Sequence, residues 1–335
     1  MPWLLIAVGV AVYSNSLTGP FIFDDASVEY NEHIRQLWPP WRATIAPPQS
    51  SLSARPIASL TFAVNYALGG LDVVDYHLTN LAIHLCAGLT LFGIVRRTLS
   101  QTRFRTWCGH SEGTLAFVAA LFWIVHPLQT ESVAYVIQRT ELLMGLFYLL
   151  TLYCLIRGAS GPHSYRWYAA SIAACVLGMG CKEVMATAPI ALLLYDRTFL
   201  SNSLRQALRK RRVLYVVLAA SWLWLGWLVT SEPRSDSAGL ALAHLGPFDY
   251  AKSQFGVIAR YLKLAFWPDE LCLDYDLPIA RTAGEIVPYA LLVGGLLIAS
   301  VWATWRRSAI GFLGAWVFLT LAPTSSLIPI SDLAF

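Results

Sequence analysis

The sequence predicts an all-α membrane protein, a polytopic helical bundle of about nine spans with amphipathic surface helices in its outer loops. Three observations support this fold class. The 335 residues are 56% hydrophobic and only 13% charged, whereas a soluble domain carries roughly 25% charged residues. The mean hydropathy is +0.54. The 13 Trp and 15 Tyr side chains suit the two membrane–water interfaces.

Each predicted span is an apolar run long enough to cross, or nearly cross, the bilayer. The third, fifth and sixth runs are short, so we expect tilted or re-entrant segments there. No composition shift divides the chain, and we therefore expect one transmembrane domain over residues 1–335. The predicted spans are residues 2–16, 76–95, 114–127, 133–156, 165–180, 183–195, 212–230, 285–305 and 309–328.

Basic residues gather in the short loops on one side of this predicted bundle, most densely at 96–105 and 209–212. The positive-inside rule places those loops and the N-terminus in the cytoplasm. The odd number of spans then places the C-terminus outside. Two long outer loops follow, at residues 17–75 and 231–284. Within them we expect amphipathic surface helices at 57–68 and 250–267.

Asp24 and Asp25 stand side by side where the first apolar segment ends. Carboxylates at a membrane boundary are costly to place, which favours a functional role. The alternative is a helix N-cap, in which an acid accepts free backbone N–H groups. One aspartate is enough for a cap. We therefore expect Asp24 and Asp25 to be catalytic.

Two cations follow in the predicted outer segments. Arg55 precedes Pro56, whose ring would fix the start of a surface helix. Its guanidinium can bind a phosphate through two parallel hydrogen bonds. Membrane headgroup anchoring is the alternative for Arg55. Lys182 lies between two apolar runs, and it either contacts a phosphate or pairs with Glu183.

A third group of polar residues surrounds a predicted outer hairpin. Glu131 and Gln138 are seven residues apart and share a helix face. Charges this close to the apolar segments should face a hydrated cavity. The substrate-binding candidates in this group are His126, Glu131, Gln138, Arg139 and Glu141.

Two further patterns suggest metal sites, but neither strongly. His77 and His84 are two helical turns apart, roughly 10 Å, which is too far for one ion. We expect both histidines to make hydrogen bonds between packed helices. The other pattern is a loop rich in acidic residues near the end of the second outer segment. We interpret this acidic loop first as a solvated surface and second as a metal site. Its members are Asp269, Glu270, Asp274 and Asp276.

Several short motifs occur together and in a fixed order. They are Tyr13-Ser14-Asn15-Ser16-Leu17 before Phe21-Ile22-Phe23-Asp24-Asp25, Arg55-Pro56, Tyr76-His77-Leu78-Thr79-Asn80, His126-Pro127-Leu128-Gln129-Thr130-Glu131, Gln138-Arg139-Thr140-Glu141, Lys182-Glu183 and Leu321-Ala322-Pro323-Thr324-Ser325-Ser326. Through them the sequence resembles the transmembrane and tetratricopeptide-repeat O-mannosyltransferases, which are membrane glycosyltransferases of the GT-C class.

The resemblance implies a GT-C-like fold and an activity. Such an enzyme moves a sugar, here mannose, from a polyprenyl- or dolichyl-phosphate carrier to a protein Ser/Thr hydroxyl with inversion, on the extracytoplasmic or lumenal face. Asp24 and Asp25 match the acidic catalytic motif, and Arg55 and Lys182 match positions that bind the carrier phosphate. The implied partners are the lipid-linked donor, a protein acceptor and membrane lipid, but no nucleic acid. Whether the enzyme also uses a divalent metal stays open.

The sequence departs from the resemblance at its C-terminal end. The family usually continues past the position of Phe335 into tetratricopeptide repeats, and no 34-residue repeat occurs here. We therefore expect a fragment or a single module. A bacterial inner membrane is the expected location, with the endoplasmic reticulum as the alternative. Two other functions stay open, a polytopic transporter and an inactive scaffold.

Overall fold

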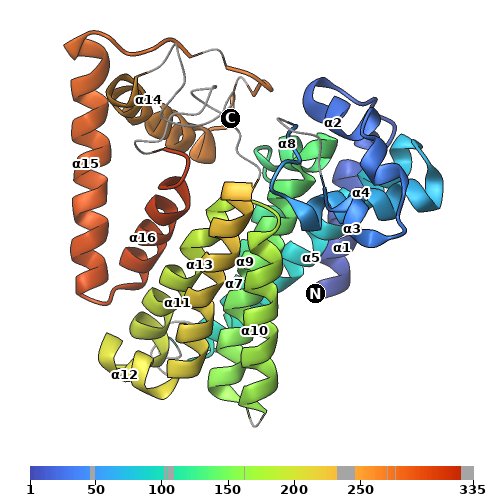
Figure 1. Ribbon diagram of the computed structural model, residues 1–335. Helices are drawn as coiled ribbons and strands as arrows, with labels where there is room; N and C mark the ends of the chain where they lie inside the picture. The colour runs from blue at the N-terminus through green and yellow to red at the C-terminus, as the bar shows by residue number, and fades with distance from the viewer. Residues whose placement is uncertain are drawn as a thin grey trace. The chain divides into compact units, whose positions relative to one another are not determined.

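The computed structural model describes residues 1–45, 50–101, 104, 109–161, 163–231, 246–269, 271–275 and 277–325. The regular structure in these residues is helical, and no strand occurs among them, as the composition predicts. Contacts divide the chain into an N-terminal unit, Met1–Ala188 with Val213–Glu232, and a C-terminal unit, Pro189–Arg212 with Pro233–Phe335 (Figure 1). One domain over 1–335 stays a prediction.

The N-terminal unit is built on two long helices, α5 and α9. Short helical turns before α4 form the first predicted outer loop. The elements are α1 (Pro2–Tyr13), η1 (Ser14–Ser16), η2 (Phe23–Asp25), α2 (Ala26–Glu29), η3 (Glu32–Arg35), α3 (Pro40–Ala43), α4 (Pro56–Gly69), α5 (Val73–Leu99), α7 (Glu112–Ile124), α8 (Gln129–Ala134), η4 (Val136–Gln138), α9 (Arg139–Ser160), α10 (Ser164–Met179), η5 (Glu183–Thr187) and α13 (Arg212–Ser231).

The C-terminal unit is smaller, and its two apolar helices α15 and α16 pack against each other. Its elements are α11 (Ala188–Tyr195), η6 (Asp196–Leu200), α12 (Leu204–Lys210), α14 (Pro247–Phe266), α15 (Ala283–Trp305) and α16 (Ala309–Leu321). The predicted surface helices at 57–68 and 250–267 are confirmed as helices by α4 and α14. Their position at the membrane interface stays a prediction.

Local sequence signals explain where these helices begin. The Asp72 carboxylate accepts a hydrogen bond from the Val74 N–H at 3.0 Å and caps α5. Pro56 opens α4 at a position where a missing N–H costs nothing. Thr282 and Glu285 form a capping box at the start of α15. These caps offset the free backbone N–H groups of each first turn.

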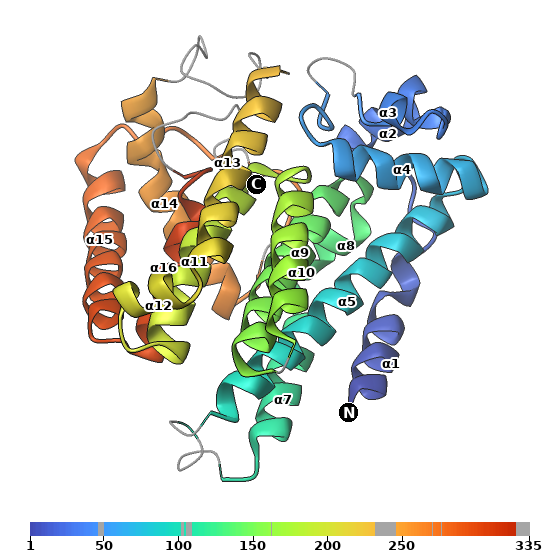
Figure 2. The same cartoon turned by 60° about the horizontal axis from the view of Figure 1, so that its bottom comes forward.

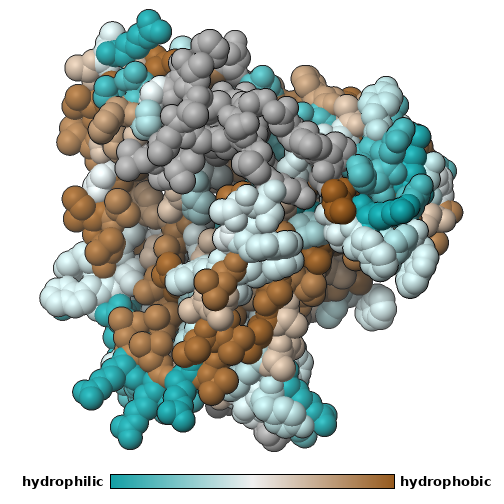
Figure 3. All heavy atoms as spheres, viewed as in Figure 1, coloured by the Kyte–Doolittle hydropathy of each residue, from teal (hydrophilic) through white to brown (hydrophobic). Residues whose placement is uncertain are grey.

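Four helical segments are long and apolar enough to cross a membrane: Val73–Leu99, Val136–Ser160, Arg212–Ser231 and Ala283–Trp305. Hydrophobic side chains cover much of α15 (Figure 3). Pro2–Ser16, Glu112–Ile124 and Ala309–Leu321 are apolar but shorter. The predicted spans 165–180 and 183–195 fall on α10, which has 16 residues, and on α11, which has 8. A membrane-spanning helical protein is therefore supported, while the count of nine spans stays a prediction.

Small residues let α1, α5 and α7 pack closely in the N-terminal unit (Figure 2). A Cβ atom on Gly9 of α1 would lie 2.4 Å from a Leu85 methyl, and one on Gly88 of α5 would lie 2.5 Å from Ile124. Helices approach this closely in membranes where glycine removes the side chain. His84 stacks on Trp123 beside this contact, and its Nε2 lies 3.0 Å from the Ile124 carbonyl. The expected packing role of His84 is thus confirmed.

Arg139 occupies the centre of the N-terminal unit and is fully buried. Its Nε donates to Asn80 Oδ1 at 2.7 Å and its Nη1 donates to Asn65 Oδ1 at 2.5 Å. Backbone carbonyls of Thr61 and Tyr76 accept two more hydrogen bonds, at 3.3 and 3.0 Å. Among the described residues, no carboxylate pairs with this cation. Arg139 therefore binds α4 and α5 to the start of α9 through neutral acceptors.

Asn80 joins this core to the chain before α9, because its amide nitrogen lies 3.3 Å from the Val136 carbonyl. We predict that Asn80→Leu destabilises the protein by about 1.5–3 kcal/mol, since it removes a hydrogen bond to a buried charge. Thermal unfolding in detergent measures the change. Cys86→Ala, on an exposed part of the same helix, is the control. Equal stability of Asn80→Leu and the parent would contradict this account.

Candidate functional site

The two adjacent aspartates have different environments. Phe23 has a φ of 43°, in the left-handed region, which costs a residue with a side chain about 1–3 kcal/mol. The turn η2 buries Asp25 completely and leaves Asp24 exposed. The sequence predicted one role for the pair, and the structure separates its members.

Asp25 is enclosed by backbone donors. Its Oδ2 accepts the Ile22 N–H at 3.0 Å, and its Oδ1 accepts the Ile137 N–H at 2.7 Å. Burial raises the pKa of the Asp25 carboxyl, although backbone hydrogen bonds and the nearby His77 act in the opposite direction. His77 itself contacts, at 3.0 Å, the carbonyl of Gly19, which lies in the turn after α1 and not in a packed helix as expected. Asp25 thus fastens the first loop to the segment before α9.

The backbone N–H and one carboxylate oxygen of Asp24 make hydrogen bonds, while the carboxylate stays accessible to solvent. Its backbone N–H donates to the Tyr135 hydroxyl at 2.9 Å, and its Oδ2 accepts the Ser51 hydroxyl at 3.0 Å. Burial is the main reason that the pKa of the Tyr135 phenol is raised. The hydrogen bond from the Asp24 backbone acts in the opposite direction, and the negative charges of Asp24, Asp25 and Glu131 raise the pKa further. Tyr135 therefore stays neutral and keeps a proton to donate. The sequence analysis missed both Ser51 and Tyr135.

Arg55 lies on the other side of Ser51. Its Nη1 donates to the Ser51 carbonyl at 2.9 Å, and its Nη2 lies 3.7 Å from Glu183 Oε2. Thr140 Oγ1 is 3.4 Å from the same Nη1. The Nε of Arg55 is buried and has no hydrogen-bond partner among the described residues. A single serine therefore connects the exposed carboxylate of Asp24 to a cation with an unused donor.

Lys182 forms an ion pair with Glu141 of α9. The alternative expectation, a pair with Glu183, is wrong, because Glu183 faces Arg55. Lys182 lies near Arg55 because the Ile57 N–H at the start of α4 donates to the Gly180 carbonyl at 3.1 Å. A Cβ on Gly180 would lie 2.6 Å from Ile57, so glycine permits this contact.

Glu131, on α8, is the last residue of this cluster of polar side chains. Its Oε1 accepts a hydrogen bond from Gln138 Nε2 at 3.2 Å. Burial raises the pKa of the Glu131 carboxyl, and the charge of Glu141 raises it further, whereas Gln138 and Lys182 lower it. Glu131, Glu141 and Lys182 thus share one electrostatic environment. We call the residues connected in this way the polar ring: Asp24, Ser51, Arg55, Glu131, Tyr135, Gln138, Thr140, Glu141, Lys182 and Glu183.

Two predicted substrate-binding residues have other surroundings. Arg139 is enclosed by α4 and α5, and its donors are used in the buried core described above. His126 lies in the turn between α7 and α8, where its Nδ1 accepts the Leu128 N–H at 3.3 Å and its ring contacts Phe122. The contacts of both residues are those of structural groups.

No three His, Cys, Asp or Glu side chains in the described part of the chain are arranged to hold a metal ion. In the predicted acidic loop, Asp269 pairs with Lys263 at 3.0 Å, and the solvated-surface interpretation of the loop stays a prediction. Glu270 and Asp276 of that loop lie outside the described residues.

A known protein family matches a segment that contains many of these site residues. The sequence profile of the dolichyl-phosphate-mannose-protein mannosyltransferase family matches residues 55–229, from Arg55 through Glu131, Glu141 and Lys182. Asp24 and Asp25 precede that match. No solved structure matches the chain at a comparable level of significance.

Curated relatives extend the similarity over most of the chain. Protein O-mannosyl-transferase TMTC2 of Homo sapiens is 26% identical over 335 aligned residues, which cover 88% of this chain and 38% of the relative. Protein O-mannosyl-transferase TMTC4 of Homo sapiens is 32% identical over 209 residues, 54% of this chain and 27% of the relative. The chain thus spans less than half the length of these relatives. Because the family profile covers more than half of its 335 residues, the chain belongs to the dolichyl-phosphate-mannose-protein mannosyltransferase family.

Proposed function

We propose that this chain carries the catalytic centre of a membrane protein O-mannosyltransferase. It moves mannose from a polyprenyl- or dolichyl-phosphate carrier to a protein Ser/Thr hydroxyl, with inversion, on the extracytoplasmic or lumenal face. Family membership supports mannosyl transfer. The observation that carries the site assignment is the Ser51 bridge, which places the exposed Asp24 carboxylate beside the Arg55 guanidinium.

Asp24 is the general base in this proposal. Its carboxylate is exposed, and Ser51 occupies one oxygen, so the second oxygen is free to accept the proton of the acceptor hydroxyl. Asp25 cannot exchange partners in the same way, because backbone N–H groups hold both of its oxygens. Asp25 therefore acts as a positioning residue for the turn that presents Asp24.

Arg55 and Lys182 bind the phosphate of the carrier. Each is held by one carboxylate, Glu183 or Glu141, whose side chains are 36% and 32% exposed. Partly exposed ion pairs are weak. An entering phosphate can therefore replace or share these contacts, and the buried Nε of Arg55 supplies an additional donor. Cations placed where negative charge develops lower the barrier to departure of the phosphate.

The reaction balances with these groups alone. The acceptor oxygen forms a bond to the anomeric carbon while the bond from that carbon to the phosphate oxygen breaks. The bonding electron pair leaves with the phosphate, and the hydroxyl proton moves to Asp24. Because the base and the leaving phosphate stand on opposite faces of the sugar, a single displacement inverts the anomeric configuration.

We predict that Asp24→Asn lowers transfer by about 10²–10⁴-fold and leaves the melting temperature near that of the parent, because only a base is removed. The measurement is turnover of polyprenyl-phosphate mannose with Ser/Thr peptides, followed by mass spectrometry. Asp25→Asn is the matched comparison. We expect its melting temperature to fall, because an amide NH₂ would face a backbone N–H. Transfer at the parent rate by Asp24→Asn would overturn the base assignment.

We also predict that Arg55→Gln and Lys182→Gln each weaken binding of a polyprenyl phosphate by about ten- to hundredfold, the value of a charge-assisted hydrogen bond. Equilibrium binding in detergent measures this change. Arg42→Gln is the control, since Arg42 is an exposed cation of the same loop that bonds Gln36. If Arg55→Gln binds the lipid as tightly as Arg42→Gln does, Arg55 does not contact the phosphate.

Glu131 gives a prediction about pH. Its pKa is raised in the folded protein, so the folded state binds the proton more tightly than the unfolded state. Stability from this group is complete below the ordinary glutamate pKa of about 4.3 and is lost as the pH rises through the raised value. We expect Glu131→Gln to raise the melting temperature at pH 7 and to leave it unchanged at pH 4. Glu32→Gln, at an exposed site, should change neither; a Glu131→Gln protein that is less stable at pH 7 would contradict the prediction.

A further inference from the structure

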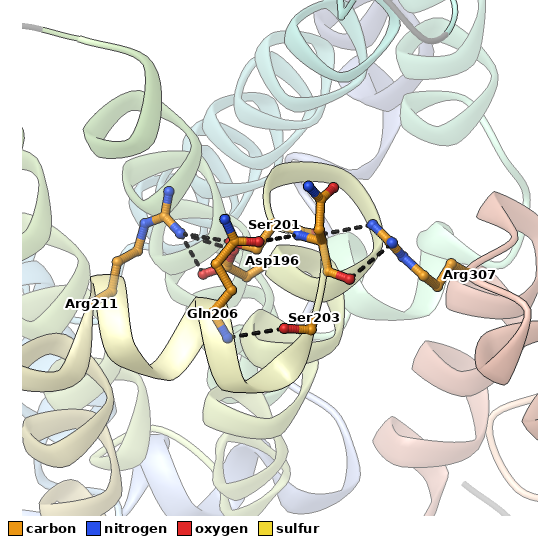
Figure 4. A network of polar contacts seen from close by, with 7 residues as sticks. Asp196, Ser201, Ser203, Gln206, Arg211 and Arg307 are labelled. Carbon is orange, nitrogen blue, oxygen red and sulfur yellow. Dashed lines mark hydrogen bonds and ion pairs between the residues drawn. The ribbon is translucent and has the colours of Figure 1, made fainter.

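A buried aspartate organises the turn between α11 and α12 in the C-terminal unit. Asp196 is fully buried at the start of η6, a short π-helix. Its carboxylate accepts the Ser201 hydroxyl at 2.7 Å and the Arg211 Nη1 at 2.8 and 2.9 Å (Figure 4). Asp196 therefore holds both ends of the segment that contains α12, and it fixes where the exposed side chains of α12 lie.

A second set of contacts attaches this segment to the end of α15. Arg307 donates to the backbone carbonyls of Ser201 and Asn202 at 2.8 and 2.9 Å. Arg197 donates to the carbonyls of Thr304 and Trp305, in the last turn of α15, at 3.0 and 3.1 Å. The short helix α12 and the end of α15 therefore form one rigid surface.

The exposed cations on this surface have no acid to balance them. Asp196 is the one carboxylate within residues 196–212 and 300–312, and Arg211 and Ser201 occupy it. No ion pair of the described residues involves the exposed cations, which we call the basic face. Its members are Arg205, Arg209, Lys210, Arg212 and Arg306.

Apolar side chains accompany the basic face. Leu204 and Leu208 of α12 are exposed and lie one turn apart, as do Arg205 and Arg209. Trp302 and Trp305 are exposed on the last turn of α15, and Arg306 lies over the Trp302 ring at 5.2 Å. Hydrophilic side chains project around α12 beyond a hydrophobic zone (Figure 3). Exposed tryptophans at the end of an apolar helix mark the level of lipid headgroups.

We infer that the basic face and its neighbouring Leu204, Leu208, Trp302 and Trp305 form a binding site for anionic phospholipid headgroups. The cations contact the headgroup phosphates, and the apolar side chains contact the upper acyl chains. A nucleic acid or an acidic protein would match the charge but would leave the leucines and tryptophans exposed to water. α15 is long and apolar enough to span the bilayer, so its end meets headgroups directly. This inference does not depend on the proposed sugar transfer.

Spin-labelled phosphatidylglycerol and phosphatidylcholine test this site with the full chain in neutral detergent. The fraction of immobilised lipid gives the preference for the anionic headgroup. We expect the parent to prefer phosphatidylglycerol, with a preference that falls as NaCl rises. The triple variant Arg205→Gln, Arg209→Gln, Lys210→Gln should lose about fivefold per removed cation at low salt. Inorganic phosphate should compete poorly, because it cannot contact the apolar side chains.

The control removes three exposed cations that precede α15 in the chain, two of them on α14, through Lys252→Gln, Lys263→Gln and Arg281→Gln. With 23 residues, α15 separates the two ends by about 34 Å. We expect this control to keep the preference of the parent. Equal binding of the two lipids by the parent, or an unchanged preference in the first triple variant, would overturn the inference. Arg209→Gln alone, at an exposed position, provides the same test if the triple variant is unstable.

Discussion

The buried guanidinium of Arg139 determines how the N-terminal unit is assembled. It is fully buried and needs hydrogen-bond acceptors, because an unpaired buried charge is among the most costly features that a protein can contain. Asn65, Asn80 and two backbone carbonyls supply those acceptors. They come from α4 and α5, so both helices must meet the start of α9. Asn80 then reaches the carbonyls before α9, in the segment whose Ile137 N–H binds Asp25. The buried core and the turn that carries Asp24 and Asp25 are thus joined through the segment before α9.

This connection also explains why the adjacent residues Asp24 and Asp25 have different environments. Successive residues of a tight turn point in different directions, and the left-handed backbone of Phe23 sharpens that turn. The carboxylate of Asp25 accepts hydrogen bonds from backbone N–H groups at both oxygens and is therefore fixed. The carboxylate of Asp24 is less constrained, because Tyr135 contacts only the backbone of this residue and Ser51 contacts only one carboxylate oxygen. The cost of the strained residue is offset by the hydrogen bonds of Asp25. A turn built in this way fixes the position of Asp24 and leaves its carboxylate exposed.

The cations of the polar ring are held in a comparable manner. Glu183 and Glu141 hold Arg55 and Lys182 in place, and the partial exposure of the two carboxylates, 36% and 32%, weakens each pair. Burial and the charge of Glu141 raise the pKa of the Glu131 carboxyl, which lies in the electrostatic environment of Lys182. In the C-terminal unit the opposite arrangement occurs. Within residues 196–212 and 300–312 of that unit, Asp196 is the one carboxylate, and it is buried and fully used, so that the exposed arginines and lysine there remain unbalanced. The position of each acid thus decides what its neighbouring cations can bind.

The sequence by itself determined the helical membrane class, the presence of the helices α4 and α14, the family and most members of the polar ring. These features depend on composition, on local periodicity and on short motifs, which a linear reading retains. The tertiary structure alone decided which aspartate is accessible, which acid pairs with Lys182, and that Arg139 lies in the core. Those outcomes depend on residues far apart in the chain, such as Asn65 and Arg139 or Asp24 and Tyr135, whose proximity follows from packing. Ser51 and Tyr135 escaped the sequence analysis for the same reason, because an isolated hydroxyl carries no signal until its partners are in place.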